Sequence, residues 1–151
     1  MRSIKKLFDD EIRDITSLGG FAFYAIITLS FLLLDQHLMS LFLALGFLFS
    51  LGVTIIIRAV WFRKRPQKQE YSDWIGKLDA SSFPSLHSNR AIFLMIALSR
   101  YFNEAYMTIL LAVVALLVLY SRSHMKKHHV SDIVVGALLG AAEYYLLVMV
   151  F

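Results

Sequence analysis

Three short polar clusters interrupt an otherwise apolar sequence, and their residue types are those that handle phosphate. The clusters are Arg58-x6-Arg65-Pro66, Pro84-Ser85-Leu86-His87-Ser88 and Ser121-Arg122-x5-His128-x3-Asp132. Arginine binds phosphoryl oxygens through charge-assisted, often bidentate hydrogen bonds. A histidine that is oriented by a carboxylate can attack phosphorus. The three clusters together therefore predict phosphoryl-transfer chemistry, which none of them predicts alone.

The two histidines suit different steps of such a reaction. His128 and Asp132 are four residues apart, so they are neighbours on a helix or its first turn. If Asp132 accepts a hydrogen bond from one imidazole nitrogen of His128, the other nitrogen is free to act as the nucleophile. His87 can then act as the general acid that protonates the leaving oxygen.

The remaining polar residues suit phosphate binding. Arg58, Arg65 and Arg122 can neutralise the phosphoryl oxygens. Ser85 and the backbone N–H groups of Leu86 and His87 would add donors, because they lie at the expected start of a helix. Phosphoryl transfer needs mainly positioning and charge neutralisation, so we expect no metal and no other cofactor.

A metal site is the alternative that these residues leave open. His124, His128 and Asp132 would share one stripe if their segment were helical, with His87 as a fourth ligand. This interpretation leaves the arginines unexplained and places cations around a cation. The neighbouring Arg63 and Lys64, taken singly, are typical of a solvated basic patch that binds anionic lipid.

Composition places these clusters in a membrane protein. The chain has 151 residues, enough for one domain, and is 58% hydrophobic with a mean hydropathy of +0.65, too apolar for a typical soluble protein. It has no cysteine, which excludes a thiol nucleophile and a disulfide framework. The net charge of +4 suits anionic lipid or phosphate, so we expect a membrane lipid as partner and no nucleic acid.

The apolar runs predict an all-α, polytopic bundle of about five transmembrane helices in a single domain. The expected spans are about 18–34, 38–60, 84–101, 105–122 and 130–151. Residues 1–16 suggest an amphipathic helix at the membrane surface, with a short solvated leader as the equal alternative. The loop 61–83 is long for a compact domain, which favours a functional role.

Five spans would bring all three clusters to the same membrane face. No crossing separates the first cluster from the second, and two crossings separate the second from the third. The same face would hold thirteen of the fifteen Lys and Arg residues. These are Arg2, Lys5, Lys6, Arg13, Arg58, Arg63, Lys64, Arg65, Lys68, Lys77, Arg122, Lys126 and Lys127. Because basic residues favour the cytoplasmic side, we predict an active site that faces the cytoplasm.

One acidic residue lies within an expected span. Glu143 follows Asp132 by about eleven residues, roughly 16 Å along a helix. A carboxyl group at that depth should face the interior of the bundle. We expect it to make a structural hydrogen bond, for example to a tyrosine, in preference to a role in substrate binding.

The combined pattern resembles the type-2 phosphatidic acid phosphatase superfamily, which carries Lys-x6-Arg-Pro, Pro-Ser-Gly-His and Ser-Arg-x5-His-x3-Asp. The resemblance covers roughly residues 9–146. It implies that His128 forms a phosphohistidine, that Asp132 orients it and that His87 protonates the leaving group. It also implies that Arg65, Arg122, Ser85 and the amide of Leu86 bind phosphate. The sequence of residues 83–91 and 128–132 most resembles the polyisoprenoid diphosphate phosphatase branch.

Two departures from the family pattern leave an alternative function open. Arg58 stands in place of the lysine, which keeps the charge but changes its geometry. Leu86 stands in place of a glycine that would let the backbone approach phosphate closely. We therefore expect a lipid phosphate or diphosphate phosphatase, with a non-catalytic lipid-phosphate-binding protein of the same fold as the main alternative. A small soluble ester as substrate is a third possibility.

Overall fold

The computed structural model describes residues 4–67 and 69–151, and within them the chain forms helices and no strands. The helices are α1 (Ile4–Ser17), α2 (Phe21–Leu33), α3 (His37–Val60), α4 (Trp74–Ala80), α5 (Leu86–Phe102), α6 (Ala105–His124) and α7 (Val130–Val150). All five predicted apolar segments and the N-terminal segment are helical. The all-α prediction is therefore confirmed.

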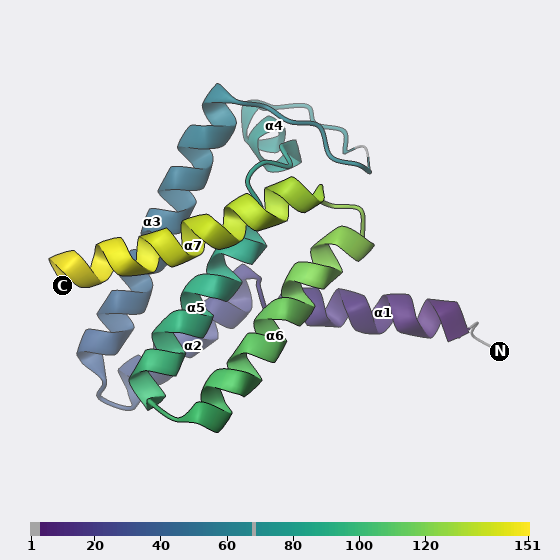
Figure 1. The fold of residues 1–151 in the computed structure, drawn as a ribbon. Helices are drawn as coiled ribbons and strands as arrows, with labels where there is room; N and C mark the ends of the chain where they lie inside the picture. Colours follow the sequence, from purple (N-terminus) through teal and green to yellow (C-terminus); the bar gives the residue numbers. More distant parts are fainter. Residues whose placement is uncertain (1–3, 68) are drawn as a thin grey trace.

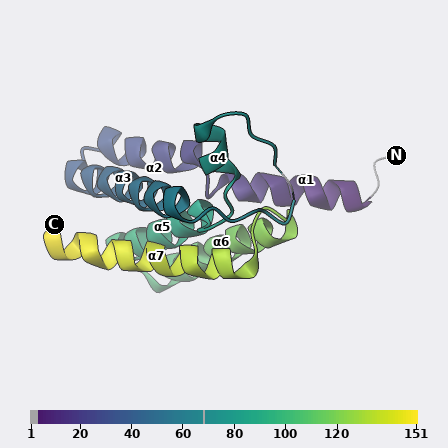
Figure 2. The ribbon, with the colours of Figure 1, turned by 90° about the horizontal axis from the view of Figure 1, so that it is seen from above.

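Helix α5 lies at the centre of the bundle and packs against α3, α6 and α7. Seen from above, α2 and α3 lie on one side of it and α6 and α7 on the other (Figure 2). Helix α1 projects from the bundle beside the end of α6 (Figure 1). The core on the α2 and α3 side is aromatic, with Tyr24, Phe42 and Phe93 buried in one cluster. Buried ring area of this kind is the main source of packing energy between helices that carry few polar contacts.

Among the residues that the structure describes, three helices are long and apolar enough to cross a membrane, namely α3, α6 and α7, with 24, 20 and 21 residues. Helix α2 has only 13 residues, and it forms a fourth candidate span only together with residues 6–17 of α1, across a bend of 44°. Helix α5 has 17 residues, about 26 Å at 1.5 Å per residue, slightly less than the hydrocarbon core. The five predicted segments thus form, while the number that crosses stays a prediction.

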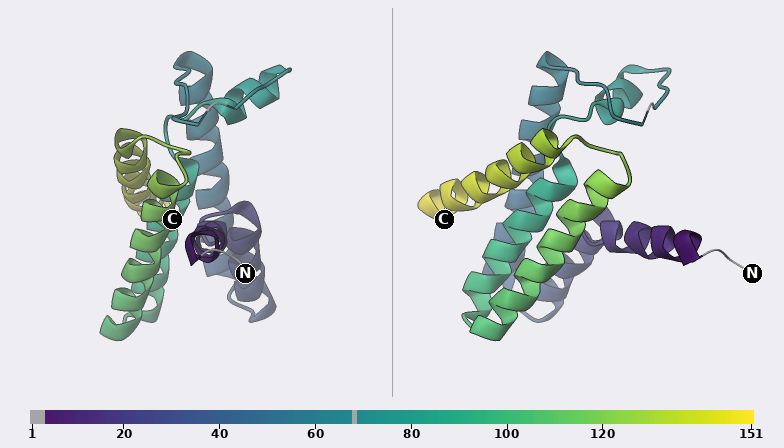
Figure 3. Two further views of the ribbon diagram at one scale, coloured as in Figure 1. Left: turned by 90° about the vertical axis from the view of Figure 1, so that its right-hand side faces the viewer. Right: turned by 45° about the vertical axis from the view of Figure 1, so that its right-hand side comes forward.

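The segment predicted as a loop between the second and third spans contains a short helix, α4. Its start is explained by Asp73, whose side chain accepts a hydrogen bond of 3.0 Å from the Gly76 amide. The loop and α4 lie at the same end of the molecule as the end of α3 and the start of α7 (Figure 3). The predicted loop 61–83 therefore includes one short helix, which Asp73 caps.

Helices α5 and α7 approach each other closely at two glycines. A Cβ added to Gly136 or Gly140 would collide with the backbone oxygen of Ser85 or Asn89, respectively. One turn further along α7, the buried Glu143 accepts a hydrogen bond of 3.0 Å from the Asn89 side chain. The predicted hydrogen bond forms, although the partner is an asparagine and not a tyrosine. This contact joins the two helices below the polar end of the bundle.

Candidate active site

The polar end of the bundle holds a cavity of about 390 Å³ between the end of α3, the start of α5 and the segment that joins α6 to α7. It is lined by Arg58, Arg65, Gln67, Gln69, Asp79, Leu86, His87, Arg122, Lys127 and His128. Six of the eight residues predicted to form the site lie on this wall. The exceptions are Ser85 and Asp132, which are both fully buried. The three clusters of the sequence therefore meet in one place.

His128 is held at both ring nitrogens. Its Nδ1 lies 2.6 Å from the carbonyl oxygen of Ser82, and its Nε2 lies 3.2 Å from Nη2 of Arg122. A carbonyl can only accept a hydrogen bond, so Nδ1 carries the proton. The lone pair is then on Nε2, where it accepts from the Arg122 guanidinium. This is the tautomer that a nucleophilic imidazole at the cavity wall requires.

The predicted hydrogen bond between Asp132 and His128 is wrong. Oδ1 of Asp132 lies 2.6 Å from Nη1 of Arg63, and Oδ2 accepts a bond of 2.9 Å from the backbone N–H of His129. The physical reason is the start of α7: the helix begins at Val130, so His128 precedes it and does not share a helical face with Asp132. At the third helical position, the Asp132 carboxylate caps the helix instead.

The surroundings of His128 favour its neutral form. Burial lowers the pKa of this imidazole well below its usual value, and the charge of Arg122 lowers it further. The hydrogen bond to Ser82 opposes both effects without outweighing them. His128 therefore keeps its Nε2 lone pair at neutral and mildly acidic pH.

The three arginines differ in how they are anchored. Arg58 donates to the carbonyl oxygens of Leu78 and Pro84, at 3.1 and 3.0 Å. Arg65 donates to the carbonyl oxygen of Asp79. These bonds fix two guanidinium groups against the segment that follows α3, while each group keeps further N–H donors on the cavity wall.

Arg122 is braced from the N-terminal helix. Its Nη1 lies 3.4 Å from Oγ1 of Thr16, and Thr16 also contacts Oγ of Ser121 at 2.5 Å. Helix α1 also contacts the end of α6, where Oδ1 of Asp9 lies 3.0 Å from Nε2 of His124. The predicted amphipathic helix therefore supports a cavity residue from behind.

Ser85 begins α5 as predicted, but its hydroxyl group faces the helix and not the cavity. It accepts from the Ser88 amide at 3.4 Å and from the Ser88 hydroxyl group at 2.9 Å. Its own amide donates to the carbonyl oxygen of Asp132, at 3.0 Å. The structure thus places Ser85 as a helix cap and as a link to α7, while its neighbour Leu86 lines the cavity.

Four cavity residues were not predicted: Gln67, Gln69, Asp79 and Lys127. The first three belong to the long segment after α3, whose length was the only signal in the sequence. Gln69 donates to Asp79 at 2.9 Å, so these two side chains form one rim of the cavity. Their polarity gives the cavity neutral and acidic groups beside the arginines.

The metal interpretation requires a helical stripe that does not form. Helix α6 ends at His124 and α7 begins at Val130, so residues 125–129 are irregular. His124 pairs with Asp9, and Asp132 pairs with Arg63. In the part of the chain that the structure describes, no three histidine, aspartate or glutamate side chains converge as metal ligands.

Comparison with known proteins identifies the family of the chain. Residues 37–151 match the PAP2 superfamily, so the chain belongs to this superfamily. No curated protein sequence matches the chain significantly. The matched region begins at α3 and includes every residue of the cavity.

Two solved structures share the fold. The crystal structure of Aquifex aeolicus LpxE is 19% identical, with a TM-score of 0.79, and the match covers 98% of this chain and 88% of that one. The PAP2-type phosphatidylglycerolphosphate phosphatase from Bacillus subtilis is 22% identical, with a TM-score of 0.75 and coverages of 97% and 77%. Family and fold together support an integral-membrane lipid phosphatase.

Proposed function

We propose that this protein hydrolyses the phosphate or diphosphate group of a membrane lipid through a phosphohistidine at His128, without a metal. The phosphoryl group binds between Arg58, Arg65 and Arg122, and Nε2 of His128 attacks phosphorus. As the phosphorus–oxygen bond of the lipid breaks, His87 donates a proton to the leaving oxygen. His87 then removes a proton from the water that hydrolyses the phosphohistidine, which releases phosphate and restores both histidines.

The observation that carries this proposal is the tautomer of His128. The proton on Nδ1 is fixed by Ser82, so Nε2 presents a lone pair beside a guanidinium that also lines the cavity. An arriving phosphoryl group has acceptor oxygens for Arg122, which releases Nε2 for attack. A protein that only binds phosphate has no need for a histidine in this state.

The test is phosphate release by purified protein from a panel of lipid phosphates, in the presence of EDTA and beside His128→Asn. The panel contains phosphatidic acid, phosphatidylglycerol phosphate and isoprenoid diphosphates of several lengths, with a soluble phosphate ester as competitor. Release that survives EDTA and is lost in the variant supports the mechanism. Release that EDTA abolishes contradicts the metal-free mechanism, and effective competition by the soluble ester contradicts the choice of a lipid.

A lipid-phosphate-binding protein is the second candidate, because Leu86 lines the cavity where related proteins carry glycine. A side chain at this position narrows the approach of phosphate to the start of α5. Saturable binding of a lipid phosphate without release would favour this candidate. Leu86→Gly would then be expected to gain turnover if the leucine alone blocks the reaction.

We also propose that the cavity faces the cytoplasm, on the basis of the excess of Lys and Arg at its end of the bundle. Lys68, one of these residues, lies outside the described residues. Single cysteines at Glu70 and at Asn103, both exposed and at opposite ends of the bundle, can be labelled in intact cells with an impermeant reagent. Labelling at position 70 and not at 103 would refute this orientation.

A further inference from the structure

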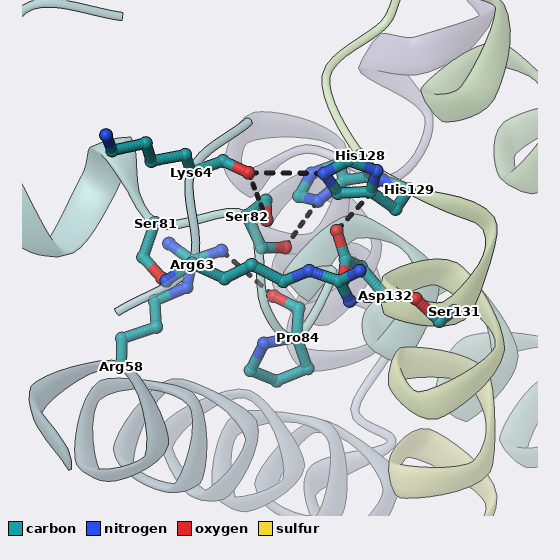
Figure 4. A network of polar contacts seen from close by, with 10 residues as sticks. All are labelled: Arg58, Arg63, Lys64, Ser81, Ser82, Pro84, His128, His129, Ser131 and Asp132. Atoms are coloured by element: carbon teal, nitrogen blue, oxygen red, sulfur yellow. Dashed lines mark hydrogen bonds and ion pairs between the residues drawn. The ribbon is translucent and has the colours of Figure 1, made fainter. Parts of the chain in front are cut away.

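Arg63 occupies a position that its sequence context does not reveal. Its side chain reaches the start of α7, where Nη1 lies 2.6 Å from Oδ1 of Asp132 and 2.8 Å from Oγ of Ser131 (Figure 4). Asp132 is fully buried, and Arg63 is its ion-pair partner in the described part of the chain. A buried carboxylate that loses such a partner becomes strongly unfavourable. Arg63 therefore stabilises the buried carboxylate of Asp132.

The backbone of the same segment holds the residues around His128. The Arg63 carbonyl oxygen accepts a bond of 2.8 Å from the Ser82 amide, and the Arg63 amide donates to the Ser81 hydroxyl group at 3.3 Å. The next carbonyl oxygen, that of Lys64, lies 3.3 Å from Oγ of Ser82 and 3.2 Å from Nε2 of His129. Figure 4 shows the Lys64 carbonyl oxygen between Ser82 and His129, the residue after His128.

These two sets of contacts form a closed path. Arg63 holds Ser82, whose carbonyl oxygen fixes Nδ1 of His128. Arg63 also holds Asp132, whose second oxygen fixes the amide of His129, the residue after His128. The imidazole and the backbone that follows it are thus anchored to one arginine. Arg63 itself is not among the residues that line the cavity.

We propose that Arg63 is a positioning residue for the nucleophile and that its side chain acts through Asp132 without touching the substrate. The backbone contact of Arg63 with Ser82 is independent of the side chain. The proposal rests on the proposed function, since it takes His128 as the nucleophile. Without the guanidinium, Asp132 and the turn at His129 lose their anchor, and Nε2 leaves the line of attack. The phosphate-binding arginines remain in place, so the loss falls on turnover and not on substrate binding.

The experiment measures kcat and KM separately for Arg63→Met and Arg63→Lys on the lipid that the wild-type protein hydrolyses best. Arg100→Met, at the opposite end of α5, is the control for loss of an arginine. We expect Arg63→Met to lower kcat about 10- to 100-fold, the usual range for groups that orient active-site ligands, with KM within about twofold. Arg63→Lys should recover part of kcat, since it restores the charge but not the planar fork.

Single-turnover phosphohistidine formation keeps the test independent of folding yield, because it is counted per molecule of protein that binds substrate. Slower formation of the intermediate with unchanged binding supports positioning. An unchanged kcat in Arg63→Met, or a loss that appears only as less folded protein, overturns it. Absence of any release by the wild-type protein would instead refute the proposed function, so the two failures are distinguishable.

Discussion

The two histidines of the cavity are held in opposite ways. His128 precedes α7 in an irregular segment, yet both of its ring nitrogens are hydrogen bonded. His87 lies in the first turn of the regular helix α5, yet its ring makes no hydrogen bond with any residue in the described ranges 4–67 and 69–151. Regular secondary structure therefore fixes the backbone of one histidine, and tertiary contacts fix the side chain of the other.

This difference fits the two chemical roles proposed for them. A nucleophile must keep one lone pair in line with phosphorus, so its orientation has to be set before the substrate arrives. An acid that protonates the leaving oxygen and then activates water contacts two different partners in turn. A ring without fixed partners can serve both steps. Substitutions at and near the two histidines test this contrast.

The largest effect is expected for His128→Asn. Removal of a nucleophile leaves only binding and charge stabilisation, so lipid phosphate release should fall about 10⁴-fold or more. Binding of the lipid phosphate should persist, because the arginines are untouched. The control is His37→Asn, at the exposed start of α3. Phosphate release at near wild-type rates by the His128 variant would exclude this residue as the nucleophile.

The effect of His87→Ala should depend on the leaving group. General acid catalysis contributes typically 10²- to 10⁴-fold, so we expect a loss of that size on the lipid. A nitrophenyl phosphate leaves as a stable phenolate and needs no proton, so the loss on this ester should be below about tenfold. Equal losses on both substrates would show that His87 has a different role.

Gly19→Ala should disturb His87 and leave His128 in place. An added Cβ would lie 2.8 Å from Cγ1 of Val118 and 3.1 Å from the backbone oxygen of His87, so one of the neighbours must move. A small displacement of a catalytic group can cost up to about 100-fold, and we expect about tenfold in kcat on the lipid. Gly52→Ala is the matched control, since nothing lies within 4 Å of its added Cβ.

A loss in Gly19→Ala that is as large on nitrophenyl phosphate as on the lipid would mean that the change reaches beyond His87. In that case the disturbance extends to the phosphate-binding residues, and the contrast between the histidines does not explain it.

The smallest effect concerns stability against pH. The folded pKa of His128 is lowered, so below pH 6.5 the unfolded chain binds a proton that the folded chain does not. His128 therefore lowers the free energy of unfolding by about 1.4 kcal/mol as the pH falls from 7.5 to 5.5. Unfolding of wild-type protein and of His128→Asn in one detergent, at pH 7.5 and 5.5, measures the difference. Equal pH dependence in both proteins would contradict the lowered pKa.

The helices themselves were largely predictable because hydrophobic runs of sufficient length have few alternatives in a membrane. The exceptions are local. Residues 18–20 form a turn before α2, and Asp73 starts a short helix in the segment after α3. Both depend on single backbone or capping contacts, and the pattern of apolar residues does not predict such contacts.

Most residues of the site were also predictable, whereas the hydrogen bonds between them were not. The order of the clusters and the two helices that run between the second and the third, α5 and α6, bring Arg65, His87 and His128 to one end. The partner of His128, however, is a backbone carbonyl oxygen, that of Ser82. Every residue carries a backbone carbonyl group, whatever its side chain. The residue type therefore cannot reveal which carbonyl oxygen is used.

The sequence by itself therefore determined the class of fold, the end of the bundle that carries the chemistry and most residues on the cavity wall. Hydrophobic length and the order of polar clusters suffice for these, because both are properties of the chain. Only the tertiary structure decided that Asp132 pairs with Arg63 and that Ser82 holds His128. These contacts join residues 46 to 69 positions apart, through one side-chain rotamer or one carbonyl direction, and such details exist only once the helices have packed.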